Sequence, residues 1–208
     1  MTVTSAQQFW EDFYRERPVW SGNPNALLVR EVDGLAPGTA LDLGCAEGAD
    51  AVWLAQRGWR VTATDVSTVA LRRAVKHAAA TGVEGIDWQQ HDLARTFPEG
   101  RFDLVCAQYL HSPVEQAGER EAILRRAAAA VAPGGLLLVI GHAGPPSWPH
   151  ELPAGVHFPT TADVLAALDL DADAWEVELE DLVERAATDT EGRPGTRPEN
   201  VLRVRRLA

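Results

Sequence analysis

Hydrophobic residues along the chain follow two different periods, and the two periods alternate. Short apolar runs, typical of strands, are separated by longer segments in which apolar residues recur every three or four positions, as they do in helices. The apolar runs predict strands at residues 39–43, 60–64, 86–90, 102–107 and 136–140. Because helical patterns separate most of these runs, they predict a parallel sheet with right-handed crossovers.

The predicted helices begin at polar capping residues and several of them end at glycines. They occupy residues 10–14, 25–32, 49–57, 67–80, 119–131 and 160–168. Asn25 and Ser67 are suited to cap two of them, and either Thr160 or Thr161 caps the last. Gly58 and Gly82 follow the ends of two helical patterns, where a left-handed residue closes a helix.

The last third of the chain has a different pattern. Apolar and charged residues alternate at 175–185 and again at 200–206, which predicts two antiparallel strands that close one edge of the sheet, joined by a polar connection at 188–198. Residues 141–159 are rich in Pro, Gly and His, and we expect them to form a loop that covers a site. The predicted fold is α/β with three layers: a mostly parallel, seven-stranded, Rossmann-like sheet with an antiparallel C-terminal strand.

A chain of 208 residues fits one domain. We expect a helical cap at 1–36, a ligand-binding core at 37–140, and a lid loop, helix and hairpin at 141–208. No apolar run approaches the roughly 18 residues that span a bilayer, and the first residues lack the pattern of a secretion signal. These observations predict a cytoplasmic protein with no membrane contact.

Charge and cysteine content exclude further classes. The net charge is −11 and Lys76 is the only lysine, which disfavours nucleic acid as a partner, since binding to phosphates depends on Lys and Arg. Cys45 and Cys106 lie in apolar, strand-like contexts without the spacing of metal ligands, so we expect no metal site and no disulfide framework. The oligomeric state is not predicted.

The turn after the first strand carries the main candidate chemistry. It reads Asp-Leu-Gly-Cys-Ala-Glu-Gly over residues 42–48, and glycines between a strand and a helix let a ligand approach the backbone. A dinucleotide site needs Gly-x-Gly-x-x-Gly, whereas the glycines here fall only at 44 and 48. An NAD-dependent oxidoreductase therefore remains only as an alternative, beside a tight turn without any ligand.

Acidic residues also follow the next two strands. Asp65 ends the second strand, at about the separation from the glycine turn at which a carboxylate meets a ribose; alternatively it caps the next helix, although Ser67 is available for that. Asp92 and Leu93 follow the third strand. Because the carboxyl ends of parallel strands meet at one edge, we expect these residues near one another.

Together these segments resemble the motifs of class I methyltransferases that use S-adenosylmethionine (SAM). Asp42, Gly44, Ala46 and Gly48 are similar to the family's acidic residue and Gly-x-Gly-x-Gly, with Ala46 in place of the middle glycine. SAM has a positive sulfonium and an amino group and no phosphate, so an acidic turn suits it. The residues that the resemblance implies for cofactor binding are Asp42, Gly44, Cys45, Glu47, Gly48, Asp65, Val66, Asp92, Leu93, Gln108 and Tyr109.

Two more segments extend the resemblance. The Phe-Asp-Leu-Val of residues 102–105 and the Pro-Gly-Gly of residues 133–135 are similar to the family's fourth strand and to its turn before the fifth. The segment 20–24 resembles the N-terminal cap of the small tellurite-resistance and thiopurine-type methyltransferases. We therefore expect Trp20 to cover the cofactor; the alternative is a packed core aromatic.

The function implied is methyl transfer from SAM to a small-molecule acceptor by in-line displacement, with S-adenosylhomocysteine (SAH) as product. If the acceptor must lose a proton, His111 or His142 is the candidate base, although a structural or solvent-facing role is as good a reading of each. The Asp/Asn-Pro-Pro-Tyr tetrad of amino-methyltransferases is absent after the fourth strand. A SAM-binding domain without catalysis is the second hypothesis.

Overall fold

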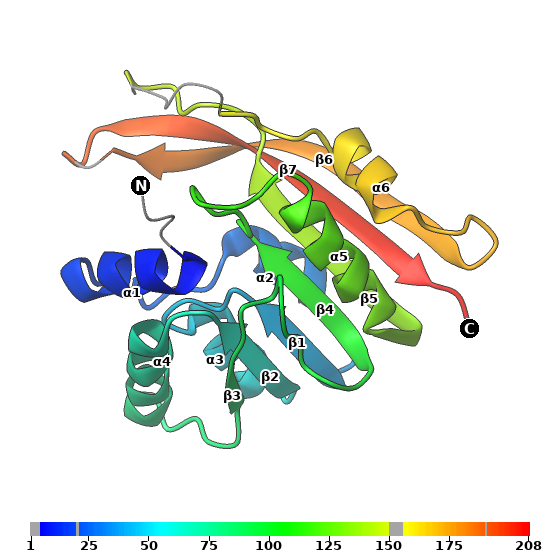
Figure 1. The fold of residues 1–208 in the computed structure, drawn as a ribbon, viewed down its shortest axis with the longest axis horizontal. Coiled ribbons are helices and arrows are strands. Elements are labelled where there is room, and N and C mark those ends of the chain that lie inside the picture. The colour runs from blue at the N-terminus through cyan, green and yellow to red at the C-terminus, as the bar shows by residue number, and fades with distance from the viewer. Residues whose placement is uncertain (1–4, 20, 150–155, 190) are drawn as a thin grey trace.

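The computed structural model describes residues 5–19, 21–149, 156–189 and 191–208, and its centre is one seven-stranded sheet. The strands are β1 Thr39–Leu43, β2 Arg60–Asp65, β3 Asp87–Gln90, β4 Phe102–Gln108, β5 Val131–His142, β6 Trp175–Thr188 and β7 Pro194–Arg206. Their order across the sheet is β3-β2-β1-β4-β5-β7-β6 (Figure 1). Only β7 runs antiparallel to its neighbours, so the predicted sheet with one antiparallel C-terminal strand is confirmed.

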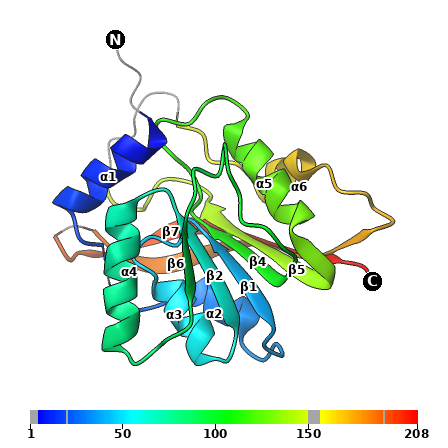
Figure 2. The same cartoon turned by 60° about the horizontal axis from the view of Figure 1, so that its bottom comes forward.

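Helices cover both faces of the sheet. They are α1 Ala6–Glu16, α2 Ala26–Val32, α3 Ala49–Gln56, α4 Thr68–Ala80, α5 Glu119–Ala129 and α6 Thr161–Leu168. Residues of α2, α3 and α4 belong to one apolar cluster, and residues of α5 and α6 belong to another on the opposite face. Figure 2 shows these two helical layers with the sheet between them.

The two clusters follow from the alternation of side chains along buried strands. On β5, Leu136, Leu138 and Ile140 pack in the cluster of α2, α3 and α4. Leu137 and Val139 lie between them in sequence and pack under α5 and α6. Because both faces are covered, the strand reads as a continuous apolar run, as is typical of parallel sheets in α/β proteins.

The capping predictions are confirmed. The Asn25 side chain accepts from Leu27 N at 2.9 Å, and the Ser67 hydroxyl accepts from Ala70 N at 3.2 Å. Thr160 rather than Thr161 caps α6, and it forms a reciprocal capping box with Asp163.

The boundary between α5 and β5 was predicted wrongly. The helix ends at Ala129 rather than at Val131, and Val131 already pairs with Phe102 at the start of β5. An irregularity then separates this pair from Leu104–Leu136. A Cβ on Gly135 would lie 2.9 Å from Val131 Cγ1, so the glycine allows the chain to bend within the strand. The apolar Val131 continues the helical spacing of α5, and this continuity concealed the boundary.

The C-terminal strands are also longer than predicted. Residues 194–198 of the segment predicted as a connection at 188–198 belong to β7, which pairs with β6 as far as Thr188–Pro194. On its other side, Pro198 O accepts from Ala143 N at 2.9 Å and Thr196 O accepts from Ser147 N at 2.9 Å. Prolines inside a strand argue against a regular ladder, and for this reason the sequence pattern did not show it.

The layered core predicts a large difference between two leucine substitutions. Leu137 is fully buried, whereas 66% of Leu182 on β6 is exposed. We expect Leu137→Ala to lower the free energy of unfolding by about 2–5 kcal/mol, because it leaves a cavity under α5 and α6. Leu182→Ala is the control and should change it by less than about 0.5 kcal/mol. Denaturant unfolding measures both values, and equal losses would contradict the assigned core.

Candidate functional site

The glycine turn between β1 and α3 contains three left-handed residues. Gly44 has φ +71°, Ala46 +51° and Gly48 +87°. A Cβ on Gly48 would lie 2.7 Å from the Trp88 ring and 2.9 Å from Ala74 Cβ, so only glycine fits there. Ala46 adopts its conformation at a cost of roughly 1–2 kcal/mol, which explains why a glycine is expected at this position.

Asp65, at the end of β2, holds this turn. Its Oδ2 accepts from Ala46 N at 3.0 Å and its Oδ1 accepts from Ser67 N at 2.8 Å. Burial raises the pKa of the Asp65 carboxyl to about 6. The side chain that caps α4 is Ser67, so Asp65 is not the helix cap. Asp65 instead connects the turn to the start of α4 and faces a cavity.

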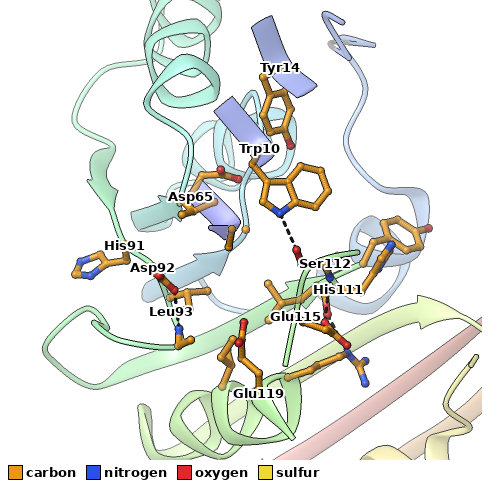
Figure 3. Close-up of a pocket in the computed structure, with 18 residues that line it drawn as sticks. Trp10, Tyr14, Asp65, His91, Asp92, Leu93, His111, Ser112, Glu115 and Glu119 are labelled. Carbon is orange, nitrogen blue, oxygen red and sulfur yellow. Dashed lines mark hydrogen bonds between the residues drawn. The ribbon is translucent and has the colours of Figure 1, made fainter. Parts of the chain in front are cut away.

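That cavity lies at the carboxyl ends of β2, β3 and β4, and residues that follow all three strands line it. Of the residues predicted for cofactor binding, it brings together Gly44, Asp65, Val66, Asp92, Leu93 and Tyr109. Leu93 is buried and gives this wall an apolar surface. Asp92 lies beside it and accepts from Ala94 N at 3.3 Å (Figure 3).

Helix α1 covers the cavity. Trp10 and Tyr14 line it, and Figure 3 shows the Trp10 indole directed toward Ser112. Trp10 Nε1 donates to Ser112 Oγ at 3.2 Å on one side. On the other side, Glu11 Oε1 accepts from Thr68 N and Thr68 Oγ1 at 2.8 and 2.6 Å.

Sequence reasoning missed Trp10 and Tyr14 as site residues. Their signal was four aromatic residues at positions 9, 10, 13 and 14 of a short amphipathic helix, which is also the pattern of ordinary packing. Trp20, expected as the cover, lies outside the described residues, and its role stays a prediction.

A second hollow adjoins the first and shares Gly44 and Tyr109 with it. It is lined by the glycine turn, Asp42, Asp50 and Gln108. The acceptor Asp42 Oδ2 and the donor Gln108 Nε2 are buried there without a hydrogen-bond partner, as is Glu47 Oε2, whose other carboxylate oxygen pairs with Arg73. Such atoms are costly unless a ligand satisfies them. An ammonium group suits the first and a carboxylate suits the second, so the hollow fits the α-amino acid end of a ligand.

The electrostatics of this hollow favour a cation. Burial raises the pKa of the Asp42 carboxyl well above its usual range, and it raises the pKa of Asp50 to about 6. Asp50 Oδ1 accepts from Asn25 N at 2.6 Å, which joins the hollow to α2. A positive ligand group would stabilise the ionised carboxylates that burial disfavours.

Two residues predicted to bind the cofactor, Glu47 and Cys45, have side chains that are buried in the protein. Glu47 is 2% exposed and its Oε1 lies 2.8 Å from Arg73 Nη1 on α4. The Cys45 thiol is buried, and Cys45 N donates to Thr64 O at 2.8 Å. Both residues line the second hollow. Their side chains hold the turn, so contact with a ligand is left to their backbone.

Of the two candidate bases, His111 lies beyond the end of β4 and His142 is the last residue of β5. Their ring centroids are 5.9 Å apart, and the His142 ring stacks on Tyr109 at 4.5 Å. Arg197 Nη1 lies 3.1 Å from His142 Nε2. A guanidinium can only donate, so this ring nitrogen is already an acceptor. Burial also lowers the pKa of His142 to about 4, which makes it a weak base. His111, unlike His142, lines the main cavity.

Tyr109 is fixed by a buried acid that the sequence did not reveal. Its φ is +51°, and its hydroxyl donates to Glu199 Oε1 at 2.7 Å. Glu199 is fully buried, and Arg185 neutralises it with two hydrogen bonds of 2.9 and 2.8 Å. Strained residues of this kind are held by their surroundings and gather at functional sites.

Comparison with known proteins relates this geometry to one family. The model of the family described as "Methyltransferase domain" matches residues 40–135, which include the glycine turn and the ends of β1 to β4. Within the described residues, no group of His, Cys, Asp and Glu is arranged to hold a metal ion.

Curated relatives share part of the chain. A 2-heptyl-1-hydroxyquinolin-4(1H)-one methyltransferase of Mycobacteroides abscessus is 32% identical over 64% of this chain and 63% of its own length. A ribosomal RNA small subunit methyltransferase C of Alcanivorax borkumensis is 31% identical over 57% and 37%. A ubiquinone biosynthesis O-methyltransferase of Methylobacterium sp. is 38% identical over 49% and 40%. The chain thus spans less than two thirds of the length of these relatives.

Solved structures share the fold. A structure reported for the conversion of a disulfide bond into a thioacetal group during echinomycin biosynthesis has a TM-score of 0.73 and 23% identity, covering 98% of this chain and 92% of the other. The N-methyltransferase NodS from Bradyrhizobium japonicum in complex with SAH has a TM-score of 0.69 and 18% identity, covering 99% and 100%. Residues 40–135 thus match the methyltransferase domain family, and the chain shares the fold of these solved structures.

Proposed function

We propose that this protein is an enzyme that transfers the methyl group of SAM to a small-molecule acceptor. The observation that carries the proposal is the pair of unsatisfied buried atoms, Asp42 Oδ2 and Gln108 Nε2, in the hollow beside the cavity lined by Asp65. One is an acceptor and the other a donor, as the two ends of an α-amino acid require. The proposal covers residues 1–208 as one methyltransferase domain of the cytoplasm.

The remaining cofactor contacts follow from the placement of the side chains. Asp42 and Asp50 would hold the ammonium group, and Gln108 would hold the carboxylate. Asp65 has lone pairs left after its two backbone bonds and would accept from the ribose hydroxyls. Val66, Asp92 and Leu93 would enclose the adenine, with Trp10 and Tyr14 above it.

The chain contributes mainly position to the reaction. The bound cofactor supplies an activated methyl group on a sulfonium. Tyr109 lines both hollows, so the region beyond it, bordered by His111, is where an acceptor would meet that group. Holding the acceptor atom in line with the sulfur–carbon bond can lower the activation free energy by on the order of 7–11 kcal/mol. Covering by α1 would exclude water from the transfer.

A small-molecule acceptor is supported by charge and by the relatives. The quinolone and ubiquinone-pathway relatives bear names of small-molecule enzymes, whereas the ribosomal RNA relatives do not. A net charge of −11 opposes an RNA surface, because phosphates repel carboxylates. The end of β4 also lacks the Asn-Pro-Pro-Tyr tetrad of base-modifying enzymes.

Turnover separates the proposal from its alternatives. The protein is incubated with SAM and a panel of acidic hydroxyls, carboxylates, thiols and amines, and SAH formation is measured by mass spectrometry. Acceptor-dependent SAH supports the enzyme. Binding of SAM without turnover on any acceptor indicates a binding domain, and binding of NAD in place of SAH indicates an oxidoreductase. No helix among the described residues is long and apolar enough to span a membrane.

The ammonium contact predicts the effect of one substitution. We expect Asp42→Asn to weaken SAH binding about tenfold to a hundredfold, the value of a hydrogen bond to a charged group. Asp87→Asn is the matched control, since Asp87 lies exposed at the amino end of β3, opposite the cavity. Isothermal titration calorimetry measures both affinities, and thermal unfolding checks the fold. An unchanged affinity in Asp42→Asn would remove this residue from the site.

The raised pKa values predict the pH dependence of binding. Below about pH 6, Asp50 and Asp65 are largely protonated in the free protein and offer less charge to an ammonium or a hydroxyl. SAH should therefore bind more tightly as the pH rises through about 6, and binding near that pH should release protons. Calorimetry in buffers of different ionisation enthalpy measures the protons released. Affinity that falls as the pH rises would contradict the assignment.

A further inference from the structure

Two arginines and two histidines gather beyond the carboxyl ends of β4 and β5. Arg120 lines the main cavity, and its Nε donates to Leu110 O at 2.9 Å. A Cβ on Gly141, near the end of β5, would lie 3.9 Å from Arg120 Nη2, which places the guanidinium between the ends of the two strands. His111 also lines the cavity, and its ring centroid lies 5.9 Å from that of His142. His142 Nε2 in turn lies 3.1 Å from Arg197 Nη1.

Neither of these two arginines forms an ion pair among the described residues. Among the described residues, neither Arg120 nor Arg197 has a carboxylate oxygen within 4.0 Å, whereas Arg185 close by is paired with Glu199. Glu115 is the acid with the strongest effect on Arg120, and its Oε2 accepts from Ser112 N at 3.0 Å. Glu115 and Glu119 also line the cavity, but neither has an oxygen within ion-pair distance of Arg120, so its guanidinium keeps free donors there.

The proposed cofactor does not use this corner. The unsatisfied atoms suited to its amino acid end lie in the second hollow, and Arg120 does not line that hollow. An arginine exposed to a cavity without an anionic partner is suited to bind an anion, because its guanidinium matches a carboxylate with two hydrogen bonds. The free donors of Arg120 are Nη1 and Nη2, since Nε is used by Leu110 O.

We propose that the methyl acceptor is an organic anion with an ionised oxygen, a carboxylate or an acidic hydroxyl, and that Arg120 binds its charge. The proposal rests on the proposed methyl transfer and specifies its substrate class. The acceptor oxygen forms the new O–CH₃ bond with its own electron pair, and the S–CH₃ bond breaks with its pair left on sulfur. The positive sulfonium and the anion become two uncharged groups, and no proton leaves.

The histidines agree with an acceptor that arrives ionised. His142 has a pKa of about 4 and its Nε2 is occupied by Arg197, so it is a poor base for a neutral alcohol. His111 lies beside Arg120, whose charge opposes protonation of the imidazole. A neighbouring guanidinium also lowers the pKa of an acidic hydroxyl on the acceptor. The hydroxyl is then ionised without a protein side chain acting as base.

Calorimetry with a matched pair of probes tests the charge preference. SAH-saturated protein is titrated at neutral pH with 2-naphthoate and with 2-naphthamide, which have the same rings but differ in charge. We expect the anion to bind at least about tenfold more tightly than the amide. Equal affinities, or no binding of naphthoate at millimolar concentration, would overturn the proposal.

Two variants assign the preference to Arg120. Arg120→Gln keeps an amide donor for Leu110 O and should abolish the difference between the probes while SAH affinity is unchanged. Arg125→Gln is the control: Arg125 lies on the same helix and also donates to one backbone carbonyl, Ala167 O at 2.9 Å, but away from the cavity. A preference that survives Arg120→Gln overturns the assignment.

Two other outcomes, an unfolded variant and a failure to bind SAH, can be distinguished from failure of the proposal. If Arg120→Gln does not fold, as judged by thermal unfolding, the charge-retaining Arg120→Lys replaces it and should keep the preference; loss of the preference in that folded variant overturns the assignment. If SAH itself does not bind, the proposed function fails, and the two probes are then titrated without SAH, where equal affinities overturn the anion preference independently.

Discussion

The two hydrogen bonds accepted by Asp65 hold together the parts on which the site depends. One fixes the glycine turn through Ala46 N and the other fixes the start of α4 through Ser67 N. The carboxylate is buried to make these bonds, and its pKa rises to about 6. The stability that it contributes is therefore full below its ordinary pKa of 3.8 and is lost as the pH rises through about 6. At neutral pH the buried carboxylate is ionised, which lowers the stability of the fold. A ligand that donates a hydrogen bond to the ionised group reduces this loss of stability.

Burial disfavours ionisation of other acids in the site as well. Asp42 and Asp50 are also buried acids whose ionised forms burial disfavours, and they lie on the side of the glycine turn away from Arg120. Among the described residues, no carboxylate oxygen lies within 4.0 Å of Arg120 or Arg197. Under the proposed function, the buried acids would face the cationic methyl donor and Arg120 would face the anionic acceptor.

Much of this arrangement follows from local patterns. The strand ends at Asp42, Asp65 and Asp92 were found from the sequence because parallel strands bring their carboxyl ends to one edge. The positions of Trp10 and Glu199 were not found, since each depends on a partner that is distant in the chain. Trp10 bonds Ser112, 102 positions away, and Glu199 bonds Tyr109, 90 positions away. No periodicity within one segment records such a pair, and an acid in an alternating strand resembles a solvent-facing residue until the strand is placed.

The long separation of Glu199 from Tyr109 also determines when the site is completed. β7 lies between β5 and β6, so the strand made last in the chain is inserted inside the sheet rather than added at its edge. Contacts of this kind form late, because closing a long loop costs entropy before the pairing compensates it. The glycine turn and its helices can form while the chain is still being synthesised. Because the Tyr109 hydroxyl bonds Glu199 on β7, we expect the end of β4 to reach its final conformation only after the C-terminal hairpin has docked.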